Sequence, residues 1–173
     1  MGTASGLVNN LVSVRASAGR TDLREERRML AELRKSLYEV PLIQTLGVVP
    51  VVMAPGEVSL ELPHRPSLLD HAGALHTAAL FGVAELAAGV VLATHPALEH
   101  VRVRRTSSAI DYLTPCYGDV VARATVEESL LATIRAGADR ATEVTIPVRV
   151  HDAVDNDIAV VRCQFVVSPP PDR

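Results

Sequence analysis

Residues 76–93 read HTAALFGVAELAAGVVLA, and this stretch decides the fold. Residues 77–93 are Ala, Val, Leu, Gly, Phe and a single Thr, with one exception, the carboxylate of Glu85. A membrane span needs about 20 apolar residues, and a charge near the middle of this shorter run favours a soluble helix. A helix that is apolar around its whole circumference must be covered on most sides by the rest of the chain. Pro96 cannot continue the helix and marks its end.

Segments typical of β-strands lie on both sides of this helix in the sequence. Before it, the segment 46–63 holds two β-rich runs around Ala54-Pro55-Gly56, which predicts a hairpin. Four later strands are expected at 99–113, at 118–130, at 141–151 and after a turn at 155–157. The economical arrangement is an α+β fold in which one antiparallel sheet wraps around the long central helix and exposes its outer face to water.

The composition is that of one ordinary folded domain, with 173 residues of which 48% are hydrophobic and 21% charged. A formal net charge of −3 gives no bulk attraction to nucleic acid or to an anionic membrane, so we expect neither as a partner. The N-terminus lacks the pattern of a signal peptide, and we expect a cytoplasmic protein. We divide the chain into a tail and helix over 1–40, the main domain over 41–168 and a tail over 169–173. The first helix is expected to start at Thr21 and to end before Pro41.

No residues are assigned to a metal site. Cys116 and Cys163 stand alone in apolar, strand-like segments, so we expect two buried free thiols rather than zinc ligands. His64 and His71 lie in the same loop as Asp70, which leaves a metal site there as a weak alternative.

Glu85 is the best candidate for chemistry. Its neighbours at helical spacing are Phe81, Gly82, Ala88 and Gly89, and none of these can pair with a carboxylate. An unpaired buried carboxylate is costly, and one that lies beside open space is a candidate general base or nucleophile. The alternative is a glutamate that reaches solvent at a gap in the sheet, or one that pairs with an arginine from elsewhere in the chain.

Two motifs in this chain match motifs of a known family. The first is Asp70-His-Ala-Gly73-Ala-Leu-His76, followed nine residues later by Glu85. The second is Tyr-Leu-Thr-Pro-Cys-Tyr-Gly-Asp over residues 112–119. Together with the order of the predicted elements, they resemble the hotdog-fold thioesterases, particularly the acyl-CoA thioesterases of the phenylacetate-degradation type. The resemblance covers roughly residues 40–168.

The resemblance implies a catalytic role for four residues. Glu85 would activate water or attack the thioester carbonyl, and the main-chain N–H of Thr77 would stabilise the oxyanion at the start of the helix. His76 would fix the helix start or bind the thioester oxygen, and Asp70 would hold the water or the carbonyl.

The resemblance also implies a substrate and an assembly. The substrate would be an acyl-CoA or an acyl-carrier thioester, with no cofactor other than the coenzyme A that forms part of it. Each site would take the loop from one subunit and the acid from the other, so a homodimer or a homotetramer is expected. The 99–113 strand would pair with its twin in that dimer, since the family pairs this way. The substrate-binding residues are expected to be Phe81, Gly73, Gly89 and Arg105. A contact to a CoA phosphate from one of Arg65, Arg102, Arg104 and Arg105 is an alternative to ordinary surface charge, which is the favoured interpretation of these arginines.

Three positions depart from the family's pattern. Thr77-Ala78 stands where the family has Gly-Gly, so the oxyanion site carries a Cβ that glycine lacks. Asp70 replaces a frequent amide, and Gly89 stands where some relatives have a hydroxyl residue that supports the acid. These departures keep open a non-catalytic acyl-CoA-binding protein. An enoyl-thioester hydratase is a further alternative, but its Asp and His are usually separated by four residues rather than the five found here.

Overall fold

The computed structural model describes residues 23–98, 101–137 and 140–169. These residues form a six-stranded antiparallel sheet in the order β1-β2-β4-β5-β6-β3. The strands are β1 (Val49–Ala54), β2 (Glu57–Leu62), β3 (Arg102–Tyr112), β4 (Val120–Thr125), β5 (Thr142–Asp152) and β6 (Asp157–Ser168). The helices are α2 (Leu23–Tyr38), α3 (Pro41–Leu46), α4 (Thr77–Thr94) and α5 (Glu128–Ala136). The predicted helix start at Thr21 lies outside the described residues.

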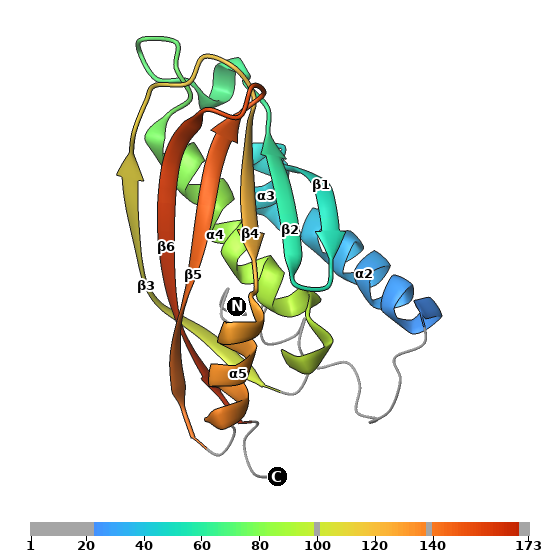
Figure 1. Cartoon of the computed structure of the whole chain (residues 1–173). Helices are drawn as coiled ribbons and strands as arrows, with labels where there is room; N and C mark the ends of the chain where they lie inside the picture. The colour runs from blue at the N-terminus through green and yellow to red at the C-terminus, as the bar shows by residue number, and fades with distance from the viewer. Residues whose placement is uncertain (1–22, 99–100, 138–139, 170–173) are drawn as a thin grey trace.

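Helix α4 is the core around which the sheet curls (Figure 1), and it packs on β2, β4, β5 and β6. Val83, Ala84, Ala87 and Val91 are fully buried against the inner face of the sheet. The apolar helix is therefore a buried core helix, as its composition predicts. It ends at His95, whose extended backbone precedes Pro96.

The alternating strand segments have the predicted faces. The inner face of β5 is formed by Val144, Ile146, Val148 and Val150, and that of β6 by Val161, Cys163, Phe165 and Val167, and all eight are buried. The β1–β2 hairpin is also confirmed. Its turn is tied to the core helix, because the Gly56 N–H donates to the buried Thr94 Oγ1 at 3.2 Å.

The strand expected over 118–130 is wrong in its second half. β4 ends at Thr125, and residues from Glu128 onward form α5 instead. Leu131 and Ile134 are spaced for one helical face, and both are buried. The early end of β4 also explains why β5 can contain Pro147, which has no N–H to donate to a neighbouring strand. The β4–β5 pairing ends at Val148, so no β4 residue pairs with the proline.

The first helix packs on the domain. Leu33 and Leu37 of α2 are buried, and α2 contacts α3, α4 and β1. It ends at Tyr38, before Pro41, as predicted. The short α3 that follows was not expected. It begins at Pro41 and is stopped by Gly47, whose φ of 65° suits glycine.

Candidate active site

Glu85 lies in the middle of α4, and its side chain faces β3 with 26% exposure. Ser108 Oγ donates to Glu85 Oε1 at 2.6 Å, and Arg105 Nη1 lies 3.1 Å from Glu85 Oε2. Both carboxylate oxygens are therefore engaged. The expectation of an unpaired carboxylate is wrong, because the arginine arrives from a strand that is distant in the sequence.

A bulge in β3 brings these two partners to the same face. Arg105 is opposite Phe165 in the register with β6, and Ser108 is opposite Cys163, with a register shift between them. Phe165 and Cys163 both point into the core. Because side chains alternate along a strand, one extra residue is needed for Arg105 and Ser108 to face inward together. The bulge thus builds the binding site of the Glu85 carboxylate.

Arg105 is held on several sides. Its Nη2 donates to the main-chain oxygen of Glu85 at 2.7 Å, and its guanidinium lies over the ring of Phe165, 5.5 Å from the ring centre. A Cβ on Gly89 would lie 3.3 Å from Arg105 Nη2. The structure therefore places Arg105 and Gly89 beside Glu85, and the guanidinium contacts both the carboxylate and the main chain of Glu85. A contact of Arg105 with a CoA phosphate stays a prediction.

Ser108 is the residue that the sequence reasoning missed. Its Oγ also lies 3.5 Å from the thiol of Cys163, which burial holds at a raised pKa. The serine supplies to Glu85 the hydroxyl that Gly89 lacks. No signal in the local sequence marks it, because strict alternation from Arg105 would turn Ser107 inward rather than Ser108. Phe81, one turn before Glu85 on α4, is half-buried against the core.

The start of α4 carries a histidine cap and, among the described residues, a main-chain donor without an acceptor. His76 is the N-cap, and its Nδ1 accepts the Ala78 N–H at 3.1 Å. A neutral ring that accepts at Nδ1 carries its proton at Nε2. The Thr77 N–H has no acceptor among the described residues, and both His76 and Thr77 are exposed. The helix start can therefore receive an oxyanion, since the N-terminal N–H groups and the helix dipole favour negative charge there.

The loop before α4 is shaped by Asp70. Asp70 Oδ1 accepts the N–H groups of Ala72 at 2.8 Å and Ala74 at 3.1 Å. Gly73 has a φ of 81°, and a Cβ there would meet nothing within 4 Å, so its backbone conformation alone calls for glycine. In the described part of the chain, Asp70 Oδ2 has no hydrogen-bond partner. One oxygen thus holds the loop, and the other is free for a ligand.

The second motif braces the first. Tyr112 Oη donates to the Thr77 carbonyl at 3.2 Å, and the Leu75 N–H donates to the Cys116 carbonyl at 2.8 Å. Asp119 accepts the N–H of His64 at 2.6 Å. The two motifs that are separate in the sequence therefore meet around the start of α4.

Within one chain, the candidate residues fall into two separate clusters. Glu85 follows Thr77 by eight residues in the same helix, which places them about 12 Å apart along its axis. Asp70, His76 and Thr77 form one cluster at the helix start. Glu85 and Arg105 form another with Ser108.

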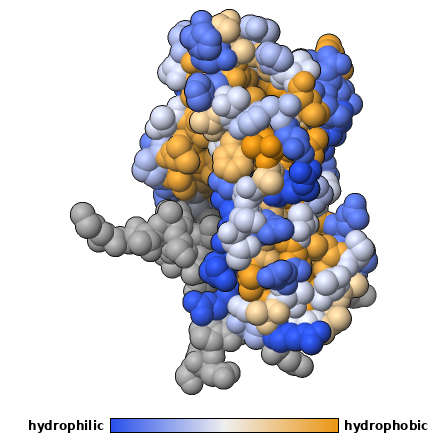
Figure 2. All heavy atoms as spheres, turned by 90° about the vertical axis from the view of Figure 1, so that its left-hand side faces the viewer, coloured by the Kyte–Doolittle hydropathy of each residue, from blue (hydrophilic) through white to orange (hydrophobic). Residues whose placement is uncertain are grey.

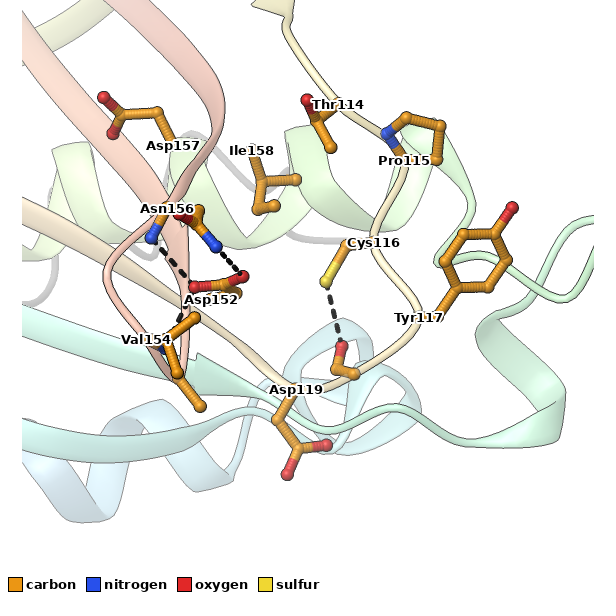
Figure 3. Close-up of a pocket in the computed structure, with 12 residues that line it drawn as sticks. Thr114, Pro115, Cys116, Tyr117, Asp119, Asp152, Val154, Asn156, Asp157 and Ile158 are labelled. Atoms are coloured by element: carbon orange, nitrogen blue, oxygen red, sulfur yellow. Dashed lines mark hydrogen bonds between the residues drawn. The ribbon is translucent and has the colours of Figure 1, made fainter.

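A hollow of about 640 Å³ lies beside the second motif, between residues 114–119 and the β5–β6 turn (Figure 3). Asp119, Asp152 and Asp157 are among its lining residues, so its charge does not suit the phosphates of a nucleotide. Cys116 also lines it, and burial raises the pKa of its thiol. Glu85 does not line this hollow. Cys116 and Cys163 are both buried and free, as predicted, and the described residues contain no His, Cys, Asp and Glu cluster suited to a metal.

The sequence itself matches a known family. Residues 32–167 match the family described as "Domain of unknown function (DUF4442)". The chain belongs to the DUF4442 family. A search of curated proteins found no relative of this DUF4442 protein.

Solved structures share the fold of this DUF4442 protein. A probable thioesterase from Pseudomonas aeruginosa is similar with a TM-score of 0.71 and 20% identity, over 79% of this chain and 94% of the other. A thioesterase from Haemophilus influenzae is similar with a TM-score of 0.64 and 15% identity, over 83% of this chain and 93% of the other. The PaaI protein from the phenylacetic acid degradation operon of E. coli is similar with a TM-score of 0.62 and 16% identity, over 83% of this chain and 94% of the other. The expected hotdog fold is confirmed.

Proposed function

We propose that this DUF4442 protein hydrolyses an acyl-CoA or acyl-carrier thioester to a free acid and a thiol. The proposal is carried by two features of the same helix. Glu85 is a carboxylate held in one orientation, and at the helix start the Thr77 N–H has no acceptor in the described chain. Thioester hydrolysis needs a group that activates water and a donor that stabilises the oxyanion. The thioesterases that share the fold support this reaction class.

The reaction would proceed in two steps. In the first, Glu85 takes a proton from water as the water oxygen bonds to the thioester carbon. The carbonyl oxygen becomes an oxyanion, to which Thr77 N–H and His76 Nε2–H donate hydrogen bonds. In the second, the oxyanion re-forms the carbonyl, the carbon–sulfur bond breaks, and the thiolate takes the proton from Glu85. In the second route the Glu85 carboxylate attacks the same carbon directly, the carbon–sulfur bond breaks and the thiolate leaves. Water then hydrolyses the anhydride, which releases the acid, restores the Glu85 carboxylate and supplies the proton that the thiolate takes up.

The proposal requires a homodimer, because the two halves of the site are about 12 Å apart within one helix. β3 is an edge strand, and its outer edge pairs with no strand in the described part of the chain. Edge strands are usually covered or paired. β3 lies on the left-hand side of Figure 1, and Figure 2 shows that side of the molecule. Hydrophobic patches appear on this surface between hydrophilic residues.

The register of such a dimer follows from the contacts of β3. Ser108 contacts Glu85, and Tyr112 contacts Thr77. Ser108 and Tyr112 are four residues apart, which is about 13 Å along a strand and close to the helical separation of Glu85 and Thr77. Antiparallel pairing of two β3 strands about Ile110 would set Ser108 opposite the partner subunit's Tyr112. Glu85 of one chain would then lie beside the helix start of the other, and two complete sites would result.

A second candidate is a non-catalytic protein that binds acyl-CoA. It is favoured by one observation: Arg105 and Ser108 occupy both carboxylate oxygens of Glu85. In that case the helix start would bind a thioester, but no group would activate water.

A panel of acyl-CoAs decides between the candidates. The panel covers short, long and aromatic acyl groups, and thiol release and ligand binding are both measured on each one. We expect thiol release with at least one class, in a protein that elutes as a dimer or tetramer. Binding without release would support the second candidate, and a monomer at micromolar concentration would contradict the dimeric site. Hydration of crotonyl-CoA serves as the control for hydratase activity.

A further inference from the structure

The Arg105 side chain contacts both the carboxylate and the main-chain oxygen of Glu85. One guanidinium nitrogen lies 3.1 Å from the carboxylate, and the other donates to the main-chain oxygen at 2.7 Å. Two contacts from one planar group fix its orientation relative to the helix, and arginine is suited to this because its donors form a rigid fork. Arg105 therefore holds Glu85 in one direction, which a single ion pair would not do.

Gly89 makes room for this arrangement. It lies four residues after Glu85, on the same side of α4, and a Cβ there would lie 3.3 Å from Arg105 Nη2. Glycine is less favourable than alanine inside a helix, so its presence in α4 calls for a reason. The close approach of the guanidinium to the helix supplies that reason.

The remaining sides of the carboxylate and the guanidinium are also occupied. Phe165 lies under the guanidinium, and Ser108 holds the second carboxylate oxygen. Only 33% of the Arg105 side chain and 26% of the Glu85 side chain are exposed, so most of the surface of the pair is covered by the protein.

We propose that Arg105 is a positioning residue that aims the Glu85 carboxylate, and that Gly89 exists to admit its guanidinium. This inference rests on the proposed function, since it gives the orientation of Glu85 a purpose in the reaction. It is an alternative to a contact of Arg105 with a CoA phosphate.

The first test compares two glycines of α4. Each substitution adds a Cβ that would lie 3.3 Å from the end of a side chain, Arg105 Nη2 in Gly89→Ala and a methyl group of Leu46 in Gly82→Ala. Both neighbours must therefore shift slightly, but only the first shift moves a group that contacts Glu85. We expect kcat to fall about 10-fold or more in Gly89→Ala, because a misplaced catalytic group loses rate steeply. KM should stay within about twofold, and Gly82→Ala should match the wild type in both constants. Equal kcat values for the two alanine variants would overturn the inference.

The second test separates positioning from phosphate binding. Arg105→Lys keeps the charge and loses the fork, so the inference expects a lower kcat with an unchanged KM in both Arg105→Lys and Arg105→Met. In the Arg105→Met background, Gly89→Ala should have no further effect on kcat, because the guanidinium that it would displace is already absent. A phosphate contact would instead raise KM in Arg105→Met, would be largely preserved by lysine, and would be independent of Gly89. That pattern would refute the inference.

A third measurement needs no substrate. Melting temperatures of Glu85→Gln, Arg105→Met and the double variant form a cycle, and we expect the two changes to be non-additive because the residues contact each other. If the wild type hydrolyses no thioester and the cycle is non-additive, the proposed function fails while the clamp on Glu85 stands. If the wild type is active and the cycle is additive, the function stands and the clamp fails.

Discussion

The two ends of helix α4 carry the same local feature in different surroundings. At each end a histidine Nδ1 accepts the main-chain N–H two residues further on, His76 from Ala78 and His95 from Ala97, both at 3.1 Å. His76 is exposed, and the Thr77 N–H beside it has no acceptor in the described chain. His95 is half-buried against the β1–β2 turn, where a Cβ on Gly56 would lie 3.1 Å from its ring.

The difference shows that the local motif alone does not indicate a site. At the second end the histidine stops a helix, and the chain covers it. At the first end the same capping geometry leaves donors open, next to an uncovered edge strand. We therefore expect large effects on activity from changes at the first end and at Glu85, and only effects on stability from changes at the second end.

Glu85→Gln is expected to have the largest effect. It keeps the shape of the side chain and removes the charge, so hydrolysis should fall by about 10²-fold or more, as for loss of a general base. The partly exposed ion pair with Arg105 contributes only about 0–1 kcal/mol to the free energy of unfolding, so the melting temperature should fall slightly. Rates and melting curves are measured on the same preparation. A folded variant with near-normal hydrolysis would assign Glu85 a purely structural role.

Thr77→Pro tests the open end of the helix directly. Thr77 is the first helical residue, where proline fits, and the extended backbone of His76 tolerates a following proline. The variant lacks the N–H that would stabilise the oxyanion and also the threonine side chain, and we expect kcat to fall by about 10²-fold, as for removal of one oxyanion donor.

Thr77→Ala is the matched control for this change. It keeps the N–H and removes the side chain, so it should retain most of the activity. Equal rates for Thr77→Pro and Thr77→Ala would remove the oxyanion role from the helix start.

Mixed dimers sharpen the comparison further. A dimer of one Glu85→Gln chain and one Thr77→Pro chain is isolated with two different tags. If each site combines Glu85 of one subunit with Thr77 of the other, one site carries both changes and the second carries neither. The mixed dimer should then have about half of the wild-type activity, by the symmetry of a two-fold interface. If each site lies within one chain, both sites are damaged and the mixed dimer is as inactive as its parents.

Most of the fold could be predicted from the sequence because its main signals are local. The apolar circumference of α4, the alternation along β5 and the turn at Gly56 each depend on residues that are close in the chain. The helix α5 was missed because the alternation before it continues through Val126, and the change of period occurs only at the next residues. The residue at which the strand leaves the sheet is set by tertiary packing rather than by the local sequence.

The candidate site was predictable only in part. Asp70, His76 and Glu85 stand in a linear motif, so their spacing could be recognised. The ion pair of Arg105 with Glu85 depends on a bulge in β3, and a one-residue change of register decides which side chains face inward. The sequence reasoning considered a distant arginine but could not identify it, and it had no means of finding Ser108.

The smallest expected effect is at the closed end of α4. Burial, followed by the charge of Arg135, lowers the pKa of His95, while Glu128 opposes the shift. The folded state therefore binds a proton at His95 less readily than the unfolded chain, whose histidine pKa is about 6.5. The resulting stability is fully present above that value and is lost as the pH falls through the lower folded pKa.

His95→Asn keeps an acceptor for the Ala97 N–H and removes the titration. We expect the urea midpoint of the wild type to fall more than that of the variant between about pH 7.5 and pH 5. Midpoints that fall in parallel would show that acidification reaches the fold through other groups, whereas hydrolysis at pH 7.5 should be the same in both proteins.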